Sequence, residues 1–280
     1  MKIVKIMGGL GNQMFQYAFG QLLGKDVCYD LSWFEYSKNS KNVTHRNYEL
    51  DFFDIQIKKL TKKQAKKYKK NNKLLSLLGI KTSLKKINES PAGVYNPKLL
   101  NEKEGVFEGF FQCAQYYEPI REQLLKDFTP VVKISNDNQK ILELIHQNNS
   151  VSLHVRRGDY LNLQHIHGLC DLSYYEKAID YIAQHIEHPY FFLFSDDIEW
   201  VKENLKINHP YTIVNINSGS NSPWDIWLMK HCKHNIIANS SFSWWGAWLN
   251  ENTEKIVIAP QKWNVTNTST DIIPQEWKRI

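Results

Sequence analysis

Val-Ser-Leu-His-Val-Arg-Arg-Gly-Asp-Tyr, residues 151–160, decides the fold of this 280-residue chain. Its first half is a short apolar run that predicts a buried strand, and its glycine begins a loop. An imidazole, two guanidinium groups and a carboxylate therefore stand where the strand ends. Ligands of open α/β sheets bind outside the carboxyl ends of the strands, and the planar fork of an arginine suits phosphate. The stretch predicts an α/β protein with a phosphorylated ligand at the edge of its sheet.

Strands and helices alternate from this stretch to the end of the chain. Four successive units with continuous apolar strands predict a buried parallel sheet. The expected strands are 151–156, 190–195, 211–216, 234–238 and 255–259, and the expected helices are 173–187, 197–205, 223–233 and 241–250.

The first half opens in a similar way. A strand at 2–7 runs into a glycine turn at 8–12, and a helix follows at 13–24. This order is typical of a Rossmann-like half-domain, although the turn is not the full dinucleotide fingerprint. We expect two Rossmann-like domains, residues 1–140 and 141–280, that face each other across a cleft. The other elements expected in the first half are strands at 27–31 and 105–112 and a helix at 115–127.

Three polar clusters follow strands of the second half. Because the carboxyl ends of parallel strands meet at one edge, these clusters should face the same crevice. Arg156 can bind phosphate in a bidentate fork, and a helix that starts at Ser240 or Ser241 offers N–H groups and a favourable dipole. A carboxylate at Asp196 or Asp197 can accept N–H donors from a purine such as guanine. The sequence therefore predicts a nucleotide-diphosphate site. The clusters are His154 to Asp159, Ser195 to Asp197, and Asn239 to Ser241.

Each cluster also has a structural interpretation. Serine and asparagine at a helix start are common N-caps, and Asp196-Asp197 can equally cap the helix that follows. Adjacent strand residues face opposite sides, so one of the two arginines is expected to pair with a buried carboxylate. His154 can be a core histidine. The aromatic run 242–248, with three tryptophans, favours core packing over a wall for a sugar or base.

Most of the positive charge lies in one segment. Residues 58–86 contain 12 lysines and no acidic residue, so that 23 of the 35 basic residues remain elsewhere against 29 acidic ones. A solvated helix face, a mobile loop or contact with an anionic membrane surface would each explain this segment. No aromatic interleaving or known motif supports a nucleic-acid partner.

The cysteines and the ends of the chain bear on location. Four scattered cysteines show no metal-binding spacing, and we find no signal peptide and no long apolar run. We therefore expect a cytoplasmic protein with reduced thiols. The acids at 196 and 197 are adjacent and do not form the Asp-x-Asp that holds a divalent ion, so we expect no metal and no other cofactor.

Taken together, these segments resemble the bacterial α-1,2-fucosyltransferases of glycosyltransferase family 11. The resemblance follows the family's order, and the joint pattern is highly specific although each piece alone is not. It rests on Gly-Gly-Leu-Gly-Asn-Gln-Met-Phe-Gln-Tyr at 8–17, the 154–160 run, Phe-Ser-Asp-Asp at 194–197 and Asn-Ser-Ser-Phe-Ser-Trp-Trp-Gly at 239–246, with Arg-Asn-Tyr-Glu-Leu at 46–50 and Glu-Gly-Phe-Phe-Gln at 108–112.

The resemblance implies a GT-B-like fold with an acceptor-side N-terminal domain and a donor-binding C-terminal domain. It implies transfer of L-fucose from GDP-β-L-fucose, with inversion and without a metal, to the 2-hydroxyl of a terminal galactoside. That acceptor would be a galactose-terminated oligosaccharide or a lipid-linked glycan in O-antigen synthesis. The lysine-rich segment, outside the shared pattern, would then contact the inner membrane peripherally.

The resemblance also implies functions for individual residues. Arg156 would bind the β-phosphate with help from Ser240 or Ser241, and Asn239 would belong to the same donor site. His154 and Asp197, or alternatively Asp196, would lie near the guanosine, and Gly11-Asn12 would close on the diphosphate. These residues form the expected site.

The general base for the acceptor hydroxyl stays open. Asp159 is the first candidate, and it can equally orient Arg157, while Glu108 is a weaker candidate. Two rival hypotheses are a nucleotide-sugar-binding protein with a degenerate site and a GT-B transferase for another GDP-sugar.

Overall fold

The computed structural model describes residues 1–280 except 41–42, 62, 66–83, 159–167 and 266–270. The chain forms two compact units, Met1–Thr129 and Pro130–Ile280, and each is described by itself.

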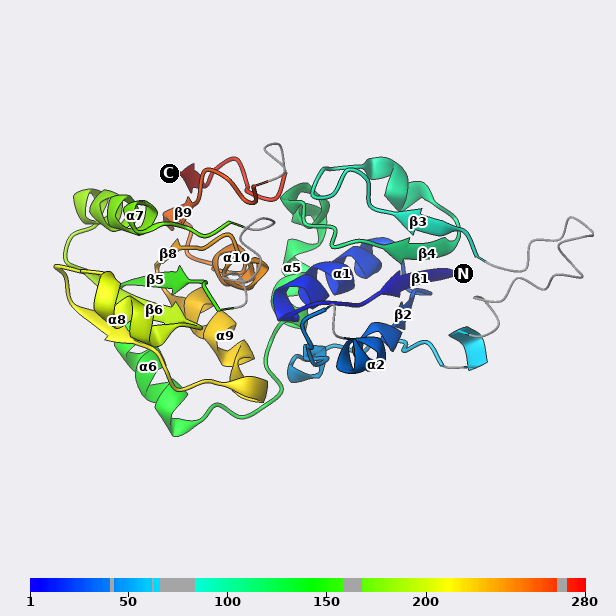
Figure 1. The fold of residues 1–280 in the computed structure, drawn as a ribbon, viewed down its shortest axis with the longest axis horizontal. Coiled ribbons are helices and arrows are strands. Elements are labelled where there is room, and N and C mark those ends of the chain that lie inside the picture. Colours follow the sequence, from blue (N-terminus) through cyan, green and yellow to red (C-terminus); the bar gives the residue numbers. More distant parts are fainter. Residues whose placement is uncertain (41–42, 62, 66–83, 159–167, 266–270) are drawn as a thin grey trace, which may run out of the picture. The chain divides into compact units, whose positions relative to one another are not determined.

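The first unit contains a parallel sheet in the order β2-β1-β4-β3. The glycine turn begins at Gly8, shortly after β1, so the N-terminus of α1 stands at the carboxyl edge of this sheet (Figure 1). Buried aromatic rings fill the core, and Phe19 and Phe111 stack with centroids 3.8 Å apart. The strands are β1 Lys2–Lys5, β2 Cys28–Asp30, β3 Lys86–Asn88 and β4 Gly105–Glu108, and the α-helices are α1 Leu10–Leu22, α2 Ser32–Asn39 and α5 Arg121–Asp127.

The second unit contains a larger parallel sheet in the order β10-β9-β8-β5-β6-β7. The strand order reverses between β5 and β8, which is the topological switch point of a doubly wound Rossmann fold. The strands are β5 Asn149–Val155, β6 Pro189–Ser195, β7 Tyr211–Ile213, β8 His234–Ile236, β9 Val257–Ala259 and β10 Lys278–Arg279.

Helices cover both faces of this second sheet (Figure 1). Alternate residues of β6 point to opposite faces: Leu193 packs in one core with α7 and α8, and Phe194 packs in the other with α6 and α9. The α-helices are α6 Asn136–Gln147, α7 Leu172–His185, α8 Ile198–Asn204, α9 Pro223–His231 and α10 Ser241–Trp248.

The expected α/β, GT-B-like fold class with two Rossmann-like domains is confirmed. The cleft between the domains and their acceptor-side and donor-side functions stay predictions. The division expected after residue 140 falls inside α6, whereas the structure divides the chain at Thr129 and Pro130, because α6 packs on β5 and α9. The sequence analysis did not predict α2, β3, α6 or β10.

Candidate functional site

The carboxyl edge of the second sheet gathers the predicted polar clusters. Arg156 follows β5, Asp196 follows β6, and Asn239 and Ser240 lie between β8 and α10. Since β5 pairs with both β6 and β8, the three strand ends are neighbours. Each cluster therefore flanks the switch point or stands one strand from it.

Arg156 is paired with an acid in this structure. Its Nη1 lies 3.0 Å from Oδ2 of Asp196, and both side chains are partly exposed. The other carboxylate oxygen of Asp196 accepts the backbone N–H of Arg157 at 2.9 Å. A side chain at Gly158 would collide with the same carboxylate. Asp196 thus holds the turn that carries Arg156, and its expected contact with guanosine stays a prediction.

Arg157 is also paired with an acid, but the partner carboxylate is partly exposed and not buried as the sequence analysis expected. Its Nε lies 3.3 Å from Oδ2 of Asp197, and its guanidinium carbon lies 3.9 Å from the ring centroid of Trp200. Oδ1 of Asp197 accepts the N–H of Trp200 at 3.2 Å and caps α8. Asp197 therefore has the capping function that the sequence analysis left open, and its contact with guanosine stays a prediction.

His154 is a buried, neutral side chain at the end of β5. Its Nδ1 lies 2.9 Å from Oγ of Ser243 on α10, and only 4% of the residue is exposed. Burial, together with the charge of Arg156, lowers the pKa of His154 to about 3. The imidazole therefore carries no charge at neutral pH and joins β5 to α10 across the switch point.

The start of α10 is tightly held. Ser240 is the N-cap, and its Oγ accepts the N–H of Phe242 at 3.3 Å. Nδ2 of Asn239 donates to the carbonyl of Trp263 at 3.1 Å, and Asn239 and Ser240 are both buried. Ser241, half-buried, is the first residue of the helix. The N–H groups of this helix start stand at the carboxyl edge, where an anion would meet them.

The tryptophans of α10 form core. Trp244 and Trp245 have no exposed surface and Trp248 only 3%. The rings of Trp244 and Trp248 stack with centroids 5.7 Å apart, and the indole N–H of Trp244 donates to the carbonyl of Ile272 at 2.6 Å. The core interpretation is the one the structure supports.

Gly11 and Asn12 belong to the first unit, in the first turn of α1. The turn before them needs a glycine, because Gly8 has a φ of +81°. Oδ1 of Asn12 accepts Nε2 of Gln112 at 2.8 Å, which joins α1 to the segment after β4. Their predicted closure on the diphosphate is a relation between the two units and stays a prediction.

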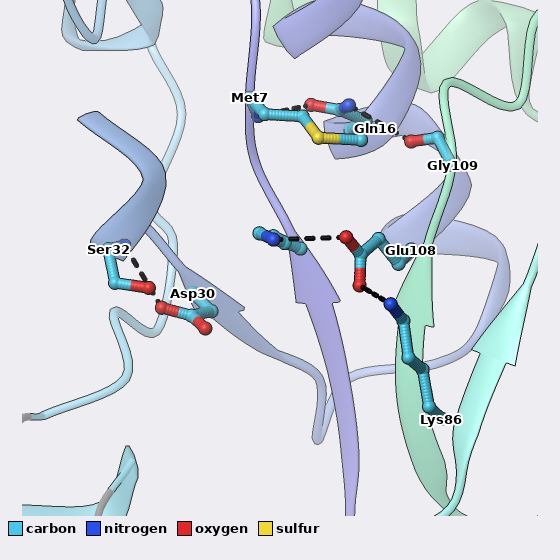
Figure 2. Close-up of polar contacts among 8 residues, drawn as sticks. Met7, Gln16, Asp30, Ser32, Lys86, Glu108 and Gly109 are labelled. Carbon is cyan, nitrogen blue, oxygen red and sulfur yellow. Dashed lines mark hydrogen bonds and ion pairs between the residues drawn. The ribbon is translucent and has the colours of Figure 1, made fainter. Parts of the chain in front are cut away.

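Glu108, the weaker candidate base, is neutralised by two cations (Figure 2). Lys5 lies 3.0 Å and Lys86 2.8 Å from its carboxylate oxygens. Burial alone would raise the pKa of Glu108, but the hydrogen bonds from the two lysines outweigh it and the pKa is lowered. A carboxylate held in this way is a poor general base.

Asp159, the first candidate base, lies outside the described residues, as does most of the lysine-rich segment. Three lysines of that segment are described with acidic partners. They are Lys59 with Asp51, Lys85 with Glu102 and Lys86 with Glu108.

Asp225 is a candidate that sequence reasoning missed. It lies in the first turn of α9, where an acid is usually explained by the helix dipole. Burial raises the pKa of Asp225 to about 7, although a hydrogen bond from Asn217 at 2.8 Å opposes the shift. Carboxyl groups with pKa values near neutrality gather at functional sites. The run Pro223-Trp224-Asp225, an acid among large apolar residues, was the available signal.

Two general searches cover the described residues. No group of three or more His, Cys, Asp or Glu side chains is placed there to hold a metal ion. Within the same residues, no helix has the length and apolar character needed to cross a membrane.

Comparisons with known proteins give a consistent result. The family model for glycosyl transferase family 11 matches residues 1–280. An O-antigen biosynthesis glycosyltransferase, WbnK, of Escherichia coli is 36% identical over 97% of this chain and 98% of its own length. An alpha-1,2-colitosyltransferase of the same organism is 37% identical over 99% of this chain and 98% of its own.

More distant matches are partial or structural. The human galactoside alpha-(1,2)-fucosyltransferase 1 is 29% identical over 50% of this chain and 41% of its own length. Among solved structures, the NodZ alpha-1,6-fucosyltransferase co-crystallised with GDP covers 88% of this chain and 91% of its own, with 13% identity and a TM-score of 0.47.

Proposed function

This chain belongs to glycosyl transferase family 11, and from that premise we propose that it transfers L-fucose from GDP-β-L-fucose to the 2-hydroxyl of a terminal galactoside. Transfer inverts the anomeric centre, from the β-linked donor to an α-linked product. The biological setting is O-antigen or another surface polysaccharide, in keeping with the name of the E. coli relative WbnK.

The observation that carries the proposal is the arrangement around the switch point of the second sheet. Arg156 follows β5, and the capped start of α10 follows β8, its neighbour. A guanidinium fork and a helix N-terminus at adjacent strand ends suit a diphosphate. The imidazole of His154, which is hydrogen-bonded to Ser243 of α10, is neutral and adds no charge.

The proposed chemistry is stabilisation of the leaving group. As the bond from fucose to phosphate breaks, positive charge grows on the sugar and negative charge on GDP. Arg156 and the N–H groups of α10 meet that negative charge in a fixed geometry, which is commonly the largest catalytic contribution. Asp196 keeps the guanidinium of Arg156 in position. We propose that these donors stabilise the leaving diphosphate without a metal ion.

Asp159 is the proposed general base, and bracing of Arg157 is its alternative function. Replacing it with asparagine separates the two. If Asp159 is the base, the variant should have a lower kcat and a changed pH profile of kcat. If Asp159 only orients Arg157, the variant should mainly bind GDP more weakly.

The decisive experiment is an assay of the purified protein with GDP-fucose and a panel of galactosides, followed by linkage analysis by NMR. We expect a fucosyl-α-1,2-galactoside product and unchanged rates in the presence of EDTA. GDP-mannose in place of GDP-fucose should give no product. Tight binding of GDP without any transfer or hydrolysis would favour the rival hypothesis of a nucleotide-sugar-binding protein.

A colitosyl donor is the second candidate. It is favoured by the 37% identity to a protein named alpha-1,2-colitosyltransferase over nearly the whole chain. Comparing the kcat/KM for GDP-fucose with that for GDP-colitose, using one galactoside, decides between the two sugars. A preference of about tenfold corresponds to 1.4 kcal/mol in the transition state.

A further inference from the structure

The segment after β4 is held by an acid from another part of the first unit. Oε2 of Glu89 accepts two consecutive backbone N–H groups, from Phe110 at 2.8 Å and Phe111 at 2.9 Å. Oε1 of Glu89 accepts a third, from Gly93 at 2.8 Å. A side chain at Gly109 would collide with Glu89. One carboxylate thus fixes the backbone at the point where the strand ends.

Phe111 has a backbone conformation that a bulky residue rarely adopts. Its φ is +53°, in the left-handed region, which costs about 1–3 kcal/mol. The conformation is held by the Glu89 carboxylate, by stacking of the Phe111 ring on Phe19, and by the hydroxyl of Tyr117, which donates to the Phe111 carbonyl. Such strain persists only where the surroundings determine it several times over.

This conformation places two successive phenylalanines in opposite environments. Phe111 is fully buried, whereas Phe110 is 38% exposed. The residue before Phe110 is also held in place: the Gly109 carbonyl accepts a hydrogen bond from Nε2 of Gln16 at 3.0 Å. Oε1 of Gln16 in turn accepts a hydrogen bond from the N–H of Met7 at 2.8 Å (Figure 2). An exposed apolar residue alone needs no explanation, but here a strained, multiply bonded frame presents one at the ligand edge of the sheet.

The segment that follows Phe110 is hydrogen-bonded to a residue of the expected site. Gln112 donates to Oδ1 of Asn12 at 2.8 Å, in the first turn of α1. Ligand sites combine an apolar surface with a few fixed polar groups. This segment offers both, in the partly exposed ring of Phe110 and the hydrogen-bonded amide of Gln112.

We propose that Phe110 is the platform on which the acceptor pyranose stacks. The proposal rests on the proposed function, because it takes the acceptor to be a galactoside. The axial 4-hydroxyl of galactose leaves the C–H groups at C3, C4 and C5 together on one face of the ring. That weakly positive face complements the negative face of an aromatic ring, and the fixed backbone keeps the ring in place before the sugar arrives.

The kinetic test compares Phe110→Ala with Phe110→Trp. We expect Phe110→Ala to raise the KM for the galactoside by about tenfold or more, with a much smaller change in the KM for the donor. Phe110→Trp should restore the acceptor KM. The matched control is Tyr211→Ala, which removes a 49% exposed aromatic side chain at the amino end of β7 in the other unit. Unchanged acceptor KM in Phe110→Ala overturns the proposal.

A binding test separates this proposal from the proposed function. Saturation-transfer NMR of the wild-type protein with methyl β-galactoside should show the strongest transfer to H3, H4 and H5, and the signal should be lost in Phe110→Ala. Methyl β-glucoside, whose equatorial 4-hydroxyl places H4 on the face opposite H3 and H5, should give a weaker signal. No galactoside signal with the wild-type protein, or an equal signal with Phe110→Ala, overturns the proposal. Phe110-dependent galactoside binding without transfer from GDP-fucose would support it and reject the donor assignment.

Discussion

Arg156 is the residue on which the proposed chemistry depends most. Arg156→Ala should lower kcat/KM by about a hundredfold or more in a folded protein, because it removes a fixed donor to the leaving group and leaves Asp196 facing the phosphate. Arg156→Lys should also fail, since a point charge cannot replace the fork. Lys202→Ala, an exposed cation on α8 of the same unit, is the matched control. Activity near the wild-type value in Arg156→Ala would reject the assignment.

Asp225 makes a prediction about the pH dependence of stability. Its folded pKa of about 7 lies above the ordinary value of 3.8, so the native state holds a proton there that the unfolded chain releases. The stability it contributes is therefore complete below about pH 4 and is lost as the pH rises to 7. Asp225→Asn keeps the shape and the hydrogen bond from Asn217 but has no charge to bury.

The measurement is urea unfolding of wild type and Asp225→Asn at pH 5 and pH 8. From pH 5 to pH 8, the free energy of unfolding of the variant should rise relative to that of the wild type by roughly 3 kcal/mol. Parallel changes in both proteins would show that Asp225 has an ordinary pKa.

At the start of α10, a substitution of Ser240 tests whether this residue only caps the helix or also contacts the ligand. Ser240→Ala removes the Oγ that accepts the Phe242 N–H, so the free energy of unfolding should fall by about 1 kcal/mol. The affinity for GDP, measured by calorimetry, should fall with it because the helix start is no longer fixed. Ser240→Thr should restore both quantities. Loss of stability with wild-type GDP affinity would leave Ser240 as a cap only.

The elements themselves show what the sequence could predict. The strands β5 and β6 are apolar runs that are followed by charged residues, and each lies within two residues of its expected bounds. Helix α6 was missed because its polar residues, among them Asn136, Asp137 and Asn138, read as a linker. The signal that was overlooked is Ser135, which caps the helix, together with the apolar residues Ile141 and Ile145, which pack on the second face of the sheet.

The lysine-rich segment makes a prediction for the molecule as a whole. Changing the lysines at 66, 67, 69 and 70 to glutamine should weaken binding to vesicles that contain anionic lipid, by about 1 kcal/mol for each lysine at the surface. Transfer to a soluble galactoside should be unchanged. Lys59, Lys85 and Lys86 are left in place because they pair with acids of the first unit. Equal sedimentation of both proteins with anionic vesicles would exclude the membrane contact.

The candidate site was predictable in outline because parallel strands bring their carboxyl ends to one edge, whatever the details of packing. The sequence placed Arg156, Asp196 and Ser240 there correctly. It could not predict which acid pairs with which arginine, since that depends on side-chain geometry across neighbouring strands. Nor could it distinguish Glu108, whose pKa two lysines lower, from Asp225, whose pKa burial raises.

The ion pair of Arg156 with Asp196 has a consequence for the release of product. In this structure the guanidinium that we propose to bind phosphate is electrically balanced by a carboxylate 3.0 Å away. A bound diphosphate must share that guanidinium, so its ground-state affinity is lower than that of an unpaired arginine would be. We therefore expect GDP to dissociate quickly after transfer and to be a weak inhibitor of the reaction.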